Sequence, residues 1–179
     1  MADTPMGQIW RGRLAFVALS FLIIFLQLLP LDARPGGWPP PDILLLIAVA
    51  WSTRRPEMAP ISFIAVIFMM TDLLFQRPPG LWAGLVVIFC EILRRRARQF
   101  RNTPLLIEWV SIAIGIVAIT ALHRLVLAVV VSPQAPLGLT ILQTGLTICL
   151  YPVIVLVAHL VFGVSRPAPG ATDSLGHRL

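Results

Sequence analysis

Long apolar runs dominate the chain, and their lengths predict helices that cross a membrane. Two shorter runs, Ile43–Thr53 and Gly80–Leu93, fall below the roughly 18 residues that suggest a spanning helix, so each either crosses, re-enters or lies at the interface. Four runs reach or exceed about that length: Leu14–Leu31, Met58–Phe75, Leu105–Val131 and Leu137–Val164. The pattern predicts an all-α integral membrane protein.

The placement of arginine favours six crossings with both termini in the cytoplasm, because cytoplasmic loops keep an excess of positive charge. All 14 basic residues are arginine, and six crossings place only Arg34 and Arg77 in loops on the far side, with Arg124 inside the fifth segment. The other eleven share the cytoplasmic side: Arg11, Arg13, Arg54, Arg55, Arg94, Arg95, Arg96, Arg98, Arg101, Arg166 and Arg178. We therefore expect a cytoplasmic tail over residues 1–13, a six-segment transmembrane domain over 14–164 and a disordered cytoplasmic tail over 165–179.

Composition and charge argue against several classes of protein. The chain is 58% hydrophobic and 12% charged, whereas an ordinary soluble domain has about 25% charged residues. A net charge of +6 often indicates nucleic-acid binding, but these arginines flank apolar segments and are explained by topology. No hydrolase, phosphate-loop or metal-ligand motif is found. We expect no enzymatic activity, no cofactor and no metal.

Charged residues near the predicted segments form two layers, one at each end of the bundle. In the outer layer, Arg124 is expected to pair with Asp72 or Asp42. In the inner layer, Glu108 is expected to pair with a residue of 94–98 or to reach water. Structural ion pairs that fix helix register are the simplest interpretation, and partner recognition or a proton relay are the alternatives.

Several short motifs, in order, resemble the MreD family of rod shape-determining membrane proteins. Pro41 and Asp42 enter an apolar run that ends at Trp51 and is followed by R-R-P-E at residues 54–57. The sequence D-L-L then begins at Asp72, and P-G-L at residues 79–81 opens the next predicted helix. The resemblance covers residues 41–96 by motif and the whole chain by size and hydropathy.

The resemblance implies a non-enzymatic scaffold of the bacterial cell-wall elongation machinery in the inner membrane. MreD proteins act with MreC, and through it with MreB, RodA and a class B penicillin-binding transpeptidase, in lateral peptidoglycan synthesis and cell shape. The family is also thought to be similar in fold to the S components of energy-coupling-factor transporters. For this chain the resemblance therefore implies MreC as the partner and contact with membrane lipid, with no nucleic acid.

The outer end is the predicted docking site for MreC. Its candidate residues, for a partner interface or for structural ion pairs, are Pro41, Asp42, Asp72, Arg77, Pro79, Gly80 and Arg124. A cytoplasmic basic cluster is predicted to set topology and touch anionic lipid, or to contact a cytoskeletal protein: Arg94, Arg95, Arg96, Arg98 and Arg101. The alternative function, a small-molecule carrier, would use a polar pocket built from Gln143, Thr144, Thr147 and Tyr151.

Overall fold

The computed structural model describes residues 5–29, 39–100 and 104–162, and within them every regular element is a helix. The side chains of 98–100, 161 and 162 are not described. The six helices are α1 Pro5–Leu28, α2 Ile43–Arg54, α3 Ile61–Leu74, α4 Leu81–Phe100, α5 Leu105–Val129 and α6 Leu137–Phe162. The predicted all-α class is confirmed.

The helix bounds follow the apolar runs closely. α5 and α6 begin at the predicted residues, and proline precedes α3 and α5 as their N-cap residue. Three helices differ most from expectation. α1 begins at Pro5, inside the predicted tail, and α3 has 14 residues where a spanning run was predicted. α4 continues to Phe100, so Arg94, Arg95 and Arg96 lie on a helix and not in the expected loop after Leu93. The predicted C-terminal tail at 165–179 lies outside the described residues.

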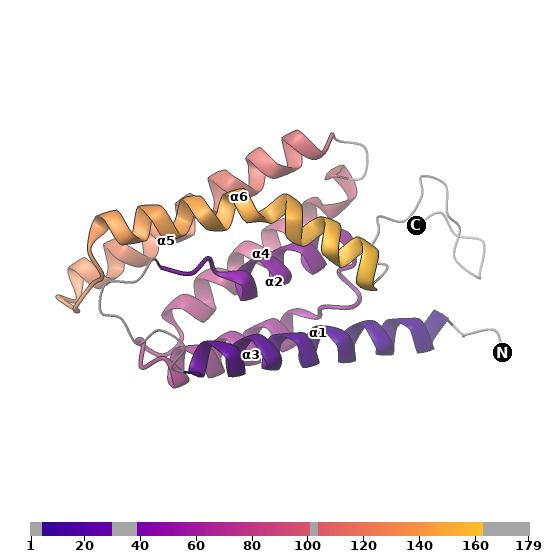
Figure 1. Ribbon diagram of the computed structural model, residues 1–179, viewed down its shortest axis with the longest axis horizontal. Coiled ribbons are helices and arrows are strands. Elements are labelled where there is room, and N and C mark those ends of the chain that lie inside the picture. The colour runs from indigo at the N-terminus through magenta and orange to yellow at the C-terminus, as the bar shows by residue number, and fades with distance from the viewer. Residues whose placement is uncertain (1–4, 30–38, 101–103, 163–179) are drawn as a thin grey trace.

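Helix α2 lies at the centre of the bundle. Its residues 44–53 are all buried, and α1, α4 and α6 pack around it (Figure 1). A helix that is apolar on every face must be surrounded by other elements, which explains this position. Trp51 is buried here against the ring of Phe16, whereas a tryptophan at a segment end usually lies at the membrane interface.

Helices α1, α5 and α6 expose long apolar faces. These three helices are long and apolar enough to cross a membrane, and only about a fifth of each is buried. Exposed side chains such as Ile114 at 66% and Leu160 at 72% would be an aggregation hazard in water but suit contact with lipid. The chain therefore has the character of a membrane protein.

One glycine marks a close approach of two helices, and another serves a turn. A Cβ at Gly115 of α5 would collide with the ring of Phe89 on α4, so a glycine is needed at this crossing. Gly84 has open space around it, although its spacing from Gly80 suggests a small-residue packing motif. Gly80 instead serves a turn, because its φ of +85° is a conformation that other residues adopt at a cost.

Candidate functional site

A buried charge network joins three helices at the end of the bundle that carries most arginines. The Glu108 carboxylate is fully buried, and Arg54 Nη2 lies 3.4 Å from Oε1 and 3.3 Å from Oε2. The Tyr151 hydroxyl donates to Glu108 Oε1 at 2.7 Å. The expected pairing of Glu108 with a residue of 94–98 stays a prediction, because the side chain of Arg98 lies outside the described residues.

Other arginines at this end, here called the arginine end, hold the loop between α2 and α3. Arg13 Nε donates to the carbonyl of Glu57 at 3.1 Å, and Arg94 Nη1 donates to the carbonyl of Ala59 at 2.6 Å. Within the basic cluster, Arg94 and Arg95 both lie near Glu91. Arg96 is exposed. The side chain of Arg98 and all of Arg101 fall outside the described residues.

At the opposite end, two aspartates cap helices. Asp42 is the N-cap of α2, and its Oδ1 accepts the N–H of Leu45 at 2.9 Å. Asp72, at the end of α3, reaches the next helix, where its Oδ2 accepts the N–H groups of Gly80 and Ala83 at 3.1 Å each. Both carboxylates thus satisfy N–H groups that a helix start leaves without partners. Pro79 lies in the exposed turn that Asp72 fastens.

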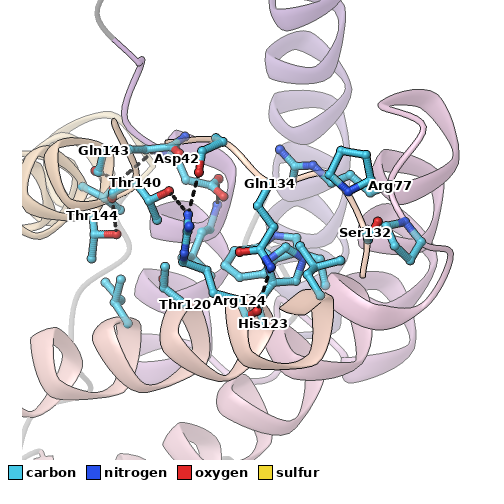
Figure 2. Close-up of a pocket in the computed structure, with 18 of the residues that line it drawn as sticks. Asp42, Arg77, Thr120, His123, Arg124, Ser132, Gln134, Thr140, Gln143 and Thr144 are labelled. Atoms are coloured by element: carbon cyan, nitrogen blue, oxygen red, sulfur yellow. Dashed lines mark hydrogen bonds between the residues drawn. The ribbon is translucent and has the colours of Figure 1, made fainter. Parts of the chain in front are cut away.

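A polar pocket of 390 Å³ opens at this same end, which we call the pocket end (Figure 2). Asp42, Arg77 and Arg124, three of the predicted site residues, line it. The pocket is bounded by the start of α2, the loop after α3, the start of α4, the end of α5, the loop 130–136 and the start of α6. Pro41 directly precedes the lining residue Asp42. The Gln143 amide donates to the carbonyl of Pro40 at 3.0 Å.

Arg124 is held by oxygen acceptors of its own helical hairpin. Its Nη1 donates to the carbonyl of Ala135 at 3.0 Å and contacts the Thr140 hydroxyl (Figure 2). In the described part of the chain no ion pair joins it to an acid, so the expected pair with Asp72 or Asp42 is wrong. The short turn between α5 and α6 places the Ala135 carbonyl within hydrogen-bonding distance of Arg124. The spacing of Arg124 from the aspartates in the sequence does not reveal this contact.

Arg77 is exposed beside the pocket, and its guanidinium lies 5.6 Å from the centre of the Phe75 ring. Asp42 is half-buried, and its desolvation raises the pKa of its carboxyl above the ordinary value, while the Leu45 N–H and the charge of Arg77 act in the opposite direction. His123 packs edge-on against Trp82 with 5.1 Å between ring centres. Its buried Nε2 has no hydrogen-bond partner among the described residues.

The residues predicted for a carrier separate into two places. Gln143, Thr144 and Thr147 line the pocket, whereas Tyr151 belongs to the Glu108 network one turn further along α6. Thr147 also accepts the backbone N–H of Asp42 at 3.0 Å, which ties the start of α2 to α6. The sequence did not identify Gln76 and Gln134 as pocket residues. Their only indication in the sequence is a position in loops, next to Arg77 and Pro133.

The helices that end at the pocket do so in an uncommon way. Gln76 and Val131 have positive φ angles of 53° and 55°, the left-handed conformation that glycine usually provides. The N–H of Arg77 bonds the carbonyl of Asp72, and the N–H of Ser132 bonds that of Leu127, as in a Schellman helix end. Both helix ends therefore hold a side chain under backbone strain at the rim of the pocket.

No family model, no curated protein and no solved structure matches this chain. The resemblance to MreD and the similarity to S components therefore remain predictions that depend on the sequence motifs.

Proposed function

We propose that this chain crosses the bacterial inner membrane six times, with both termini in the cytoplasm. The arrangement of contacts at the arginine end supports this topology. Arg13 from the N-terminal helix and Arg94 from the end of α4 both bond the loop between α2 and α3, and Arg54 meets Glu108 at the start of α5. Segments that the positive-inside rule places on one side thus lie together.

The short helix α2 is compatible with this topology because it lies inside the bundle, whereas α3 exposes apolar side chains such as Val66 and Leu73. The 12 residues of α2 and the 14 of α3 extend about 18 and 21 Å at 1.5 Å per residue, less than the roughly 30 Å of a bilayer core. Backbone groups at both ends of α2 are hydrogen-bonded within the protein: the N–H of Asp42 bonds the Thr147 hydroxyl of α6, and the N–H of Arg55 bonds the carbonyl of Trp51.

We further propose that the chain acts as an MreD-type scaffold that binds MreC and, through it, the MreB, RodA and transpeptidase assembly of lateral wall synthesis. The observation that carries the proposal is that the MreD-like residues lie at helix junctions. Asp42 caps α2, Asp72 fastens the turn at Pro79 and Gly80, and Arg54 joins α2 to α5. A family motif made of residues at helix junctions maintains the arrangement of the helices and does not indicate a catalytic reaction.

The surfaces left for a partner are the exposed apolar faces of the outer helices and the rim of the pocket end. Asp42 and Asp72 are occupied in capping, so a substitution of either would weaken MreC binding through folding as well as through contact. A photocrosslinking residue at an exposed position tests the interface more cleanly. Leu73, next to Asp72 on α3, is 61% exposed, and Leu106 near the arginine end is 65% exposed.

We expect a photocrosslinker at Leu73 to capture co-expressed MreC in native membranes and one at Leu106 to capture none. Both replace an exposed leucine, so they form a matched pair. Capture from Leu106 alone would move the interface to the arginine end. Absence of MreC from the crosslinks at both positions and from the purified complex would remove the scaffold proposal.

The polar pocket favours a second candidate, a small-molecule carrier. Three of the four residues predicted for such a role line it. A carrier must open its site to both faces of the membrane, yet the pocket lies at one end and the buried residues of α2 fill the centre of the bundle. The scaffold therefore accounts for more of the structure, and uptake assays in proteoliposomes would distinguish the two.

A further inference from the structure

The pocket end contains two guanidinium groups and one imidazole whose hydrogen-bonding capacity is only partly used. Arg124 is fixed through Nη1 to Ala135 and Thr140, which orients the guanidinium while its remaining N–H groups have no hydrogen bond within the described residues. Arg77 has a ring beneath it and no acceptor there. His123 presents a buried Nε2 without a partner in the same part of the chain. All three residues line the pocket.

The charge balance of the lining favours an anion. Asp42 is the single acid among the described residues that line the pocket, and it already accepts the Leu45 N–H at the start of α2. The partial positive charge of a helix N-terminus offsets a carboxylate in that position. Two guanidinium groups therefore face the pocket against one compensated acid. Neutral side chains complete the wall. The amides of Gln76, Gln134 and Gln143 can donate further hydrogen bonds, whereas the Thr140 and Thr144 hydroxyls already donate to backbone carbonyls.

The shape of this end suits an anion that carries an apolar tail. The pocket volume of 390 Å³ lies in the range of small-ligand sites, roughly 300–1,000 Å³. Beside it, the hairpin between α5 and α6 exposes Val129, Val130, Val131 and Leu137. In the proposed topology this hairpin lies at the headgroup level, with its valines against acyl chains.

We infer that the pocket binds a phosphate group, supplied by the headgroup of a phospholipid or by a soluble phosphate ester. Arginine presents a planar fork of donors that matches phosphate oxygens two at a time. Arg124, held in place by Thr140, and Arg77, on the opposite wall, approach the pocket from separate elements (Figure 2). Binding of a phosphate group does not depend on whether the chain engages MreC.

Native mass spectrometry of the full chain in a phosphate-free detergent tests this site with three probes. Phosphatidylglycerol supplies phosphate and tails, glycerol 3-phosphate supplies phosphate alone, and diacylglycerol supplies tails alone. We expect one saturable phosphatidylglycerol per chain and no comparable binding of diacylglycerol. Displacement of the lipid by glycerol 3-phosphate would identify a soluble ester as the source, and its failure to compete would identify a lipid. Equal binding of diacylglycerol would overturn the inference.

Arginine variants locate the binding. Arg77→Gln and Arg124→Gln should each weaken phosphatidylglycerol binding about tenfold or more, the usual size of a charge-assisted hydrogen bond. Arg11→Gln removes the same charge from an exposed position on α1, outside the predicted basic cluster, and should bind as the parent does. Because Arg124 also holds Ala135, the exposed Arg77 provides the variant that leaves the fold intact. Unchanged binding by Arg77→Gln would overturn the site.

Discussion

The two ends of the bundle use arginine in opposite ways. At the arginine end, Arg54 is 9% exposed and meets a fully buried Glu108, and Arg13 and Arg94 bond loop carbonyls. At the pocket end, Arg77 is exposed and Arg124 is anchored by one nitrogen beside a cavity. Arginine side chains therefore stabilise the packing at the arginine end. At the pocket end they keep N–H donors that have no hydrogen-bond partner among the described residues.

This difference assigns separate tasks to the two ends. A buried ion pair with additional hydrogen bonds contributes rigidity, since removal of one partner leaves an uncompensated charge in a low-dielectric interior. Donors beside an open pocket contribute little to folding but remain available to a ligand. We therefore expect substitutions of arginine at the arginine end to act on stability and those of arginine at the pocket end to act on binding.

The largest effect is expected from Glu108→Leu. Loss of this carboxylate leaves Arg54 buried without its counter-charge and the Tyr151 hydroxyl without its acceptor. Breaking one side of a buried pair typically costs about 3–5 kcal/mol. Denaturant titration in a fixed detergent micelle should show this destabilisation. Arg54→Leu combined with Glu108→Leu should recover most of it, because an apolar pair replaces the charges. A mild Glu108→Leu phenotype would show that the network is not structural.

Much of the fold is predictable from hydrophobic pattern alone. The run at Ile43–Thr53 nearly coincides with α2, and the start at Leu105 is that of α5. The cap at Asp42 is also readable, because an aspartate directly before an apolar helix is a standard start signal.

The pairings of charged residues could not be predicted in the same way. Arg54 and Glu108 are 54 positions apart, and which faces meet depends on the rotation of two helices about their axes. Asp72 caps a helix other than its own, so no local motif marks it. The pocket likewise depends on six segments whose relative placement is set by packing around α2.

A smaller loss is expected from Asp72→Ala at the pocket end. The change removes the acceptor for the N–H groups of Gly80 and Ala83 and should cost about 1–3 kcal/mol, because buried donors without partners carry the desolvation penalty. Asp42→Ala, which removes a cap from a partly exposed position, should cost less. The same unfolding titration ranks the two variants. A cost for Asp72→Ala equal to that of Glu108→Leu would erase the contrast between the ends.

The smallest effect, and the only gain, is expected from Val131→Gly. Val131 has a φ of 55° and is 89% exposed, so its side chain adds strain and almost no packing. Relief of the left-handed conformation should stabilise the folded protein by roughly 1–2 kcal/mol. The greater freedom of glycine in the unfolded chain should destabilise the folded protein by about 0.5–1 kcal/mol. The net expectation is a stabilisation of about 0.5–1 kcal/mol, measured as a higher midpoint of thermal unfolding. The neighbouring Val130→Gly, at a right-handed position, should lower that midpoint. If both changes moved the midpoint downward, the strain at the rim of the pocket would have no energetic weight, and the pocket end would differ from the arginine end in its charges alone.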